Sequence, residues 1–129
     1  DYRELRVNGA DQVARRAVLF EHFIYDLLER EPDALRFADG YTWVAIHAHC
    51  HAKALTDTSV MAKLCARLPN STVTMLNTGC CGMAGAFGQM ASKYDLSLAV
   101  ARPLVDQINQ LTAAAPIHMT ELLANALAR

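Results

Sequence analysis

Two stretches of the chain carry apolar residues at three- and four-residue steps, which is the spacing of an amphipathic helix. The first covers residues 11–31 and ends before Pro32, and the second covers residues 60–68 and ends before Pro69. Each proline marks a stop, because proline cannot continue a helix. Both stretches are therefore predicted to be helices that bury one face against a core.

Two shorter runs are rich in residues that favour β-strands. Residues 42–47 read Thr-Trp-Val-Ala-Ile-His, and residues 71–76 read Ser-Thr-Val-Thr-Met-Leu. A helical spacing returns over residues 96–111, where Pro103 is expected to break or kink it, and again over residues 120–127. The predicted order is helix, strand, helix, strand, helix, helix.

This alternation predicts an α/β fold with a small parallel sheet flanked by helices. Loops at the carboxyl ends of such strands commonly carry the chemistry. Two strands make a poor sheet, because a buried parallel sheet normally has more partners. One strand and its loop are therefore expected to be missing from the chain, unless a strand lies within residues 99–117 or neighbouring segments of a longer protein complete the sheet.

Composition and charge narrow the classes of function. The chain has 129 residues, of which 53% are hydrophobic and 19% are charged, and this suits one domain with an ordinary core. Its 12 basic and 13 acidic residues give a net charge of −1 without a basic stripe, so nucleic acid is not expected as a partner. No apolar stretch approaches the ~20 residues that cross a bilayer, so no membrane span is expected.

The start of the chain bears on location and domain organisation. It reads Asp-Tyr-Arg-Glu-Leu-Arg, which has no signal-peptide character, so a cytoplasmic protein is expected. The first residue is Asp1 and not methionine. Residues 1–129 are therefore expected to form a single domain that is a piece of a larger protein.

Three of the four cysteines are candidate metal ligands. Cys50 follows one predicted strand, and Cys80 and Cys81 follow the next, so their loops can meet because neighbouring strands lie ~4.8 Å apart. Thiolates suit zinc and iron–sulfur clusters. A disulfide framework is not expected, since a bridge between adjacent cysteines strains the backbone. Cys65 instead shares the apolar stripe of residues 60–68 and is expected to pack in the core.

Glycines and histidines surround these cysteines. Gly79 and Gly82 flank the pair, and glycine lets the backbone take positive φ and approach a bound cluster. A helix is expected to follow directly, with its N-terminal N–H groups facing the negative charge of the cluster. His49 and His51 bracket Cys50 and are candidate donors to a thiolate or to cluster sulfur.

The histidines also allow other interpretations. His47, His49 and His51 alternate, so in an extended segment they would share a face that could bind zinc. A hydrogen-bonded side chain is the favoured interpretation for His47, and His118 is expected to be satisfied at the surface or in the core. A Cys–His nucleophile is less well supported, because it needs one activated thiol and this sequence gathers several.

Two segments resemble a known family. Residues 49–55 (His-Cys-His-Ala-Lys-Ala-Leu) and 79–88 (Gly-Cys-Cys-Gly-Met-Ala-Gly-Ala-Phe-Gly) are closely similar to the cysteine-rich CCG domain. This domain occurs in heterodisulfide reductase, the glycolate oxidase iron–sulfur subunit, anaerobic glycerol-3-phosphate dehydrogenase and FAD-linked oxidases fused to iron–sulfur modules. With residues 20–23 (Phe-Glu-His-Phe), the chain looks most like the C-terminal region of the last group.

The resemblance implies an iron–sulfur cluster, of the 4Fe–4S type in the intact protein, with Cys50, Cys80 and Cys81 as ligands. In the family a further strand usually leads to a Ser-Cys-Arg or Cys-x-x-Cys segment, whereas no cysteine follows Cys81 here. Either that segment is absent, or a histidine at position 49, 51 or 118 completes the site. With three thiolates and not the four that common clusters use, this chain alone is expected to hold zinc or no metal.

The predicted function is that of an iron–sulfur, electron-transfer domain in a flavin-linked oxidoreductase acting on a 2-hydroxyacid or similar substrate. FAD is expected in a separate dehydrogenase domain or subunit, and another iron–sulfur domain is expected as a partner, so this domain alone would not be catalytic. The alternative is a non-redox structural or interaction domain with a zinc or degenerate metal site. Two structural expectations follow. The three candidate sulfurs are expected to converge, and residues 102–110 are expected to adjoin a gap, an alternate backbone path or an unfilled sheet edge.

Overall fold

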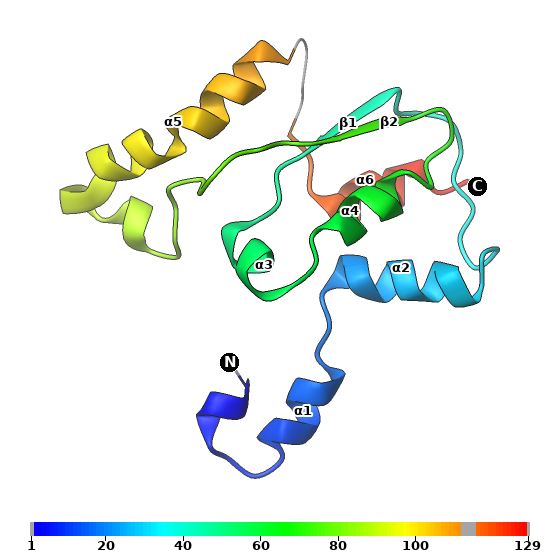
Figure 1. Cartoon of the computed structure of the whole chain (residues 1–129), viewed down its shortest axis with the longest axis horizontal. Helices are drawn as coiled ribbons and strands as arrows, with labels where there is room; N and C mark the ends of the chain where they lie inside the picture. Colours follow the sequence, from blue (N-terminus) through cyan, green and yellow to red (C-terminus); the bar gives the residue numbers. More distant parts are fainter. Residues whose placement is uncertain (1, 112–115, 129) are drawn as a thin grey trace.

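The fold is organised around a two-stranded parallel sheet (Figure 1). The computed structural model describes residues 2–111 and 116–128. Within these ranges β1 (Trp43–Ile46) pairs with β2 (Thr72–Met75), and Val44 lies opposite Val73. Both strands fall inside the predicted runs, so the α/β class with a small parallel sheet flanked by helices is confirmed.

Two helices connect the strands. They are α3 (Cys50–Leu55) and α4 (Ser59–Cys65). The second was predicted from its apolar stripe, although it ends at Cys65 and not at residue 68. The segment after β1 that was expected to be a loop carrying Cys50 is helical from Cys50 onward. A helix of 6 residues is too short to show a helical period in the sequence.

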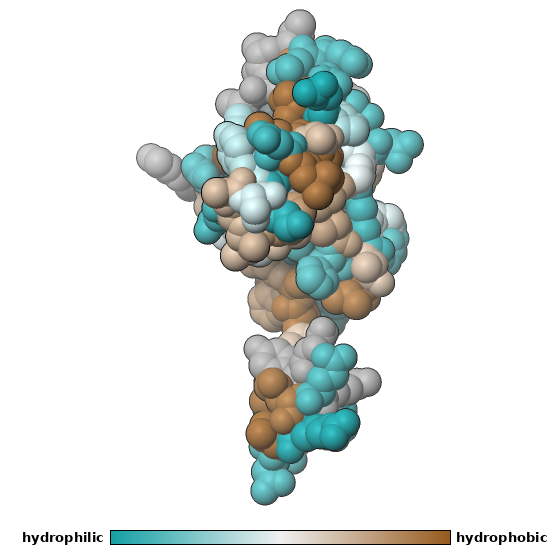
Figure 2. Space-filling model, turned by 90° about the vertical axis from the view of Figure 1, so that its left-hand side faces the viewer, coloured by the Kyte–Doolittle hydropathy of each residue, from teal (hydrophilic) through white to brown (hydrophobic). Residues whose placement is uncertain are grey.

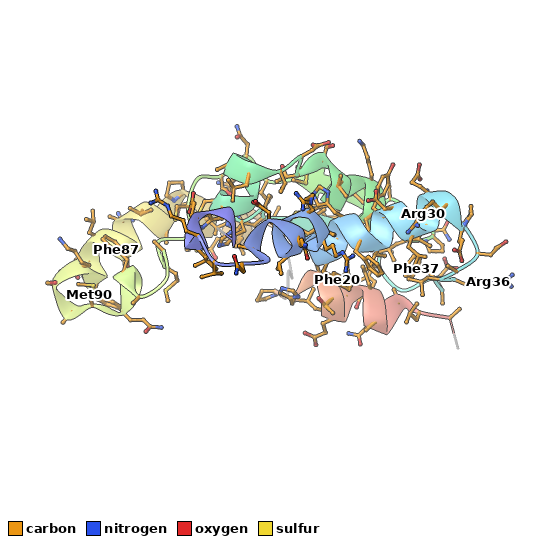
Figure 3. The ribbon with its side chains drawn as sticks, turned by 90° about the horizontal axis from the view of Figure 1, so that it is seen from below. Phe20, Arg30, Arg36, Phe37, Phe87 and Met90 are labelled. Carbon is orange, nitrogen blue, oxygen red and sulfur yellow. The ribbon has the colours of Figure 1, made fainter. Side chains whose placement is uncertain are left out.

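The hydrophobic core lies where α4 meets the sheet and two other helices, α2 (Phe20–Arg30) and α6 (Met119–Ala126). Seen from below, α2 lies between α4 and α6 (Figure 3). The residues buried here are Leu28, Val44, Ile46, Leu64, Cys65, Leu68, Leu122, Leu123 and Ala126. Helix α2 lies in the predicted stretch 11–31, α6 overlaps the predicted stretch 120–127, and their apolar faces pack in this core.

The segment before β1 fastens the last helix in place. Phe37 forms an antiparallel bridge with Leu127, and the N–H of Ala38 donates to the carbonyl oxygen of Ala126 at 2.8 Å. This pairing holds the carboxyl end of α6 beside the chain that leads into the sheet. No sequence pattern had indicated it.

The single helix predicted over residues 11–31 is divided in two. The structure has α1 (Ala10–Arg16), preceded by the 3-10 helix η1 (Tyr2–Leu5), and then α2. Ala17 and Leu19 between the helices have extended backbones, with ψ of 119° and 149°. Figure 1 shows η1 and α1 apart from the other elements. Val13 is 48% exposed, so the apolar stripe of α1 has no core to pack against and does not hold the two helices in line.

The long helix α5 (Tyr94–Gln110) follows the short 3-10 helices η2 (Phe87–Gln89) and η3 (Ala91–Lys93). Pro103 lies inside α5 and does not end it, because the fixed φ of proline is itself close to helical. Several apolar side chains of α5 are exposed, namely Leu96, Leu98, Val100 and Val105. Figure 2 looks onto the side of the molecule where α5 lies and shows hydrophobic side chains among hydrophilic ones.

The described residues contain two paired strands and no third strand in the sheet. Residues 99–110 are helical, so the suggestion of a strand hidden there is wrong for that part, and residues 112–115 lie outside the described ranges. Within those ranges each strand has one partner. The sheet therefore has an unpaired edge on either side, as the shortage of strands implied. None of the described helices is long and apolar enough to cross a membrane.

Candidate metal centre

The structure brings two predicted metal ligands together at the carboxyl ends of the strands. The Sγ atoms of Cys50 and Cys80 are 4.0 Å apart, although 30 residues separate them in the sequence. Cys50 is the first residue of α3, and Cys80 lies in the loop after β2. Cys81 follows directly, and all three cysteines are free and partly exposed. Cys50, Cys80 and Cys81 are called the thiol edge below.

The environment of Cys80 favours its thiolate. The N–H of Gly82 donates to Sγ of Cys80 at 3.4 Å, and this is the largest cause of a lowered pKa at that thiol. Hydrogen bonds from Cys50 and Cys81 lower the pKa further, while partial desolvation opposes them. Because metals bind cysteine as the thiolate, this electrostatic environment suits a ligand.

Gly82 is required by the backbone, whereas Gly79 is not. Gly82 has a φ of +84°, and a Cβ there would lie 2.2 Å from the carbonyl oxygen of Ser97 in α5. Gly79 has no positive φ, and nothing lies within 4 Å of a Cβ placed there. The reason given for glycine at position 79 is therefore wrong, and only Gly82 allows a close approach.

The helix expected directly after the cysteine pair is absent. The chain instead continues through turns to η2 at Phe87, and α5 begins only at Tyr94. Glycines with positive φ at 82 and 85 favour turns over a helix. The N–H that faces a cysteine sulfur thus belongs to Gly82 in the loop and not to a helix N-terminus.

A buried threonine joins the two cysteine-bearing segments. Thr78 is 7% exposed, and its Oγ1 lies 2.8 Å from Nδ1 of His47. Nζ of Lys53 donates to the carbonyl oxygen of Thr78. Burial, followed by the charges of Lys53 and His49, lowers the pKa of His47. The expectation of a hydrogen-bonded role for His47 is confirmed, with a loop residue and not a helix start as its partner.

His49, His51 and His118 line a cavity beside the thiol edge. The rings of His49 and His51 stack with centroids 5.8 Å apart and planes at 11°. They face a cavity of about 720 Å³, which apolar residues of β1, α3 and α6 also line together with Cys81. His118 lines it too, and its Nδ1 accepts a hydrogen bond from the N–H of Thr120 at 3.3 Å, capping α6. His118 is thus satisfied at the surface, as expected.

Cys65 belongs to the core, as its helical spacing predicted. It is 0% exposed, and its Sγ lies 3.6 Å from Sδ of Met119. Burial raises the pKa of this thiol to about 11. Cys65 therefore stays protonated at neutral pH and is not a candidate ligand.

Sequence reasoning did not single out Lys53 and Thr78. Lys53 lies within the quoted segment 49–55, but no role was assigned to it, and Thr78 has no periodicity or motif that marks it. The one available signal is its position two residues before a cysteine pair. Its burial depends on contacts with residues 25 and 31 positions away, which no local pattern reveals.

The donor atoms of the thiol edge are of the type that binds an iron–sulfur cluster, but there are too few of them. Sulfur donors, one of which has a lowered pKa and receives an N–H, are the correct chemistry. Across residues 2–111 and 116–128, however, no three His, Cys, Asp or Glu side chains gather in an arrangement that could hold a metal ion. The described residues alone do not complete a cluster, so further ligands would have to come from elsewhere.

Comparison with known proteins gives a partial match. No family model matches the chain, and no solved structure matches it. Over 67 residues it is 33% identical to the third (C) component of anaerobic glycerol-3-phosphate dehydrogenase from Escherichia coli K12, and equally to that of strain O157:H7. The match covers 52% of this chain but only 17% of each relative. About half of the chain is thus similar to part of a dehydrogenase subunit, one of the proteins in which the CCG domain was expected, while no family model confirms that domain.

Proposed function

We propose that this chain is an iron–sulfur, electron-transfer domain of a flavin-linked oxidoreductase, and that the thiol edge supplies ligands to its cluster. The observation that carries this proposal is the 4.0 Å separation of the Cys50 and Cys80 sulfurs, brought together by the ends of two paired strands. Unbridged, partly exposed thiols at such a distance suit a shared soft metal better than core packing. Cys81 is the third proposed ligand.

The partial similarity to a dehydrogenase subunit supports the wider context. Subunits work with other chains, so a flavin-bearing dehydrogenase domain or subunit and a further iron–sulfur domain are the proposed partners. The substrate of the assembly is proposed to be a 2-hydroxyacid or a similar compound, oxidised at the flavin and not in this domain. A cytoplasmic location and a single domain over residues 1–129, forming the C-terminal part of a larger oxidoreductase, remain part of the proposal.

The residues of this chain would hold the cluster and set its surroundings. When bound, an iron–sulfur cluster takes up and releases single electrons. Gly82 donates its N–H to Cys80 and so stabilises the thiolate, and its missing Cβ lets the loop pack on α5. The remaining ligands are proposed to come from another segment or subunit, because the described residues offer fewer than four thiolates.

Anaerobic reconstitution with iron and sulfide tests this proposal. The full chain is compared with Cys50→Ala and Cys80→Ala, and Cys65→Ala serves as the matched control because that thiol is buried. Iron and sulfide content and visible absorption are measured. With a downstream cysteine segment supplied to complete the ligand set, we expect the wild-type chain and Cys65→Ala to take up iron, and the two thiol-edge variants to lose most of it.

Two outcomes would count against the proposal. Equal iron uptake by Cys50→Ala, Cys80→Ala and wild type would show that the thiol edge is not the cluster site. Tight zinc binding by the wild type, with no iron uptake even when a downstream cysteine segment is supplied, would favour the alternative of a structural zinc domain.

A further inference from the structure

Thr78 connects the segment that carries Cys50 with the loop that carries Cys80 and Cys81. This residue is buried within a loop, and both its hydroxyl and its carbonyl oxygen have partners. The hydroxyl oxygen is 2.8 Å from Nδ1 of His47, and the carbonyl oxygen accepts from Nζ of Lys53. Because Thr78 comes two residues before Cys80, these contacts restrain the backbone that carries that cysteine.

Both partners of Thr78 stand close to the other cysteine. His47 is the first residue after β1, and Lys53 lies one helical turn beyond Cys50 in α3. The N–H of Lys53 donates to the carbonyl oxygen of His49 at 3.0 Å, which fixes Lys53 to the start of that helix. Cys50 is thus bracketed by the two residues that hold Thr78.

The sheet does not reach the thiols. In the described part of the chain, the last backbone hydrogen bond between the two segments joins the N–H of Leu76 to the carbonyl oxygen of Ile46 at 2.8 Å. Beyond it, the side chains of His47 and Lys53 provide the links to Thr78. The loop is also held on its other side by α5, where Nε2 of Gln107 donates to the carbonyl oxygen of Asn77 at 3.2 Å. His47 and Lys53 are the residues that tie the loop to the segment carrying Cys50.

We propose that His47, Lys53 and Thr78 form a clamp that sets the distance between the sulfurs of Cys50 and Cys80. The three are positioning residues, because they act on the thiols through the backbone. That they position metal ligands rests on the function proposed above, whereas their control of the distance between the two sulfurs does not. Contacts of this kind, which orient metal ligands, typically change metal affinity by about 10- to 100-fold.

Disulfide formation between Cys50 and Cys80 measures the clamp without any metal. The full chain is treated with diamide, which accepts two electrons and two protons from the thiols as the S–S bond forms and becomes the hydrazine. Peptide mapping then quantifies the Cys50–Cys80 bond. Only molecules in which Cys65 resists alkylation are counted, since this buried thiol reacts only on unfolding.

Lys53→Met and Thr78→Val are expected to lower the rate of Cys50–Cys80 disulfide formation about tenfold, because small misplacements of reacting groups have large effects on rate. Lys53→Arg and Thr78→Ser keep a donor and a hydroxyl and are expected to stay within about twofold of wild type. Lys63→Met is the matched control, because Lys63 lies on α4 and its ion pair is with Asp57, at 4.0 Å. Unchanged bond formation in Lys53→Met and Thr78→Val would overturn the clamp.

Cobalt(II) titration, followed by the thiolate-to-cobalt absorption band, connects the clamp to the metal centre. Lys53→Met is expected to weaken cobalt binding about 10- to 100-fold, with rescue by Lys53→Arg. A wild-type chain that binds neither cobalt nor iron even with the downstream cysteine segment supplied would remove the proposed function, while the disulfide rates would still decide the clamp. Cobalt affinity equal to wild type in Lys53→Met would show that the clamp does not position metal ligands.

Discussion

Cys80 and Cys65 show how the same side chain acquires opposite properties within one small domain. The N–H of Gly82 lowers the pKa of Cys80, whereas burial raises the pKa of Cys65 to about 11. The first thiol is partly exposed, and the second is buried in the core beside Met119. Site residues of this chain are therefore distinguished by their neighbours and not by residue type.

Gly82 is the residue at which the backbone of the thiol edge is most constrained. Gly82→Ala is expected to lower the free energy of unfolding by at least about 2 kcal/mol, because alanine is strained at positive φ and its Cβ would lie 2.2 Å from the carbonyl oxygen of Ser97. Urea unfolding measures the loss.

Substitutions at two other glycines separate the strain of positive φ from the clash of the added Cβ. Gly85→Ala should show the φ strain alone, about 1–2 kcal/mol, since nothing lies within 4 Å of its Cβ position. Gly79→Ala should change the free energy of unfolding by less than about 0.5 kcal/mol. Equal effects at positions 79 and 82 would contradict the described loop.

At the scale of elements, α4 connects the sheet to α2. Its residues Val60, Leu64 and Cys65 are buried, and Leu64 is 0% exposed. The strands are only 4 residues long, and each has an unpaired side within the described chain. The short sheet is therefore stabilised mainly by the helices packed on it, since two strands alone are only marginally stable.

Truncation of Leu64 tests this dependence. Leu64→Ala is expected to lower the free energy of unfolding by about 2–5 kcal/mol, because it leaves a cavity in the core. The matched change Leu55→Ala, in α3, should cost less than about 0.5 kcal/mol, since Leu55 is 64% exposed. Thermal or urea unfolding compares the two, and similar losses would mean that α4 is not the central packing element.

For the whole molecule, two parts contrast with the packed centre, namely the segment with η1 and α1 at the bottom of Figure 1 and α5 at its left. The segment with η1 and α1 lies apart from the sheet, and its Leu5, Val7 and Val13 are exposed. Helix α5 also exposes apolar residues, including Leu96 and Val105. The stability of the described chain thus resides in α2, α4, α6 and the sheet.

Deletion of residues 1–17 tests this division. The shortened chain is expected to keep the free energy of unfolding of the full chain within about 0.5 kcal/mol, because the deleted apolar side chains named above are not buried in the core. Urea unfolding followed by far-UV circular dichroism makes the comparison. A loss above about 2 kcal/mol would show that this segment packs on the core in solution.

Local pattern was sufficient for the elements whose apolar residues face the core. Both strands, α4, α6 and the core position of Cys65 follow from residues close in the sequence, because side-chain period depends on local backbone geometry. The sequence alone also marked Cys50, Cys80 and Cys81 as candidate ligands and showed that two strands are too few for a complete sheet. Their role as ligands stays a prediction.

Only the tertiary structure decided how these parts meet. The break after Arg16 and the helix that begins at Cys50 depend on where a core is available for packing. The 4.0 Å approach of Cys50 and Cys80 and the burial of Thr78 arise from contacts between residues about 30 positions apart. Such contacts have no period in the sequence, because they are formed only when the paired strands bring their carboxyl ends together.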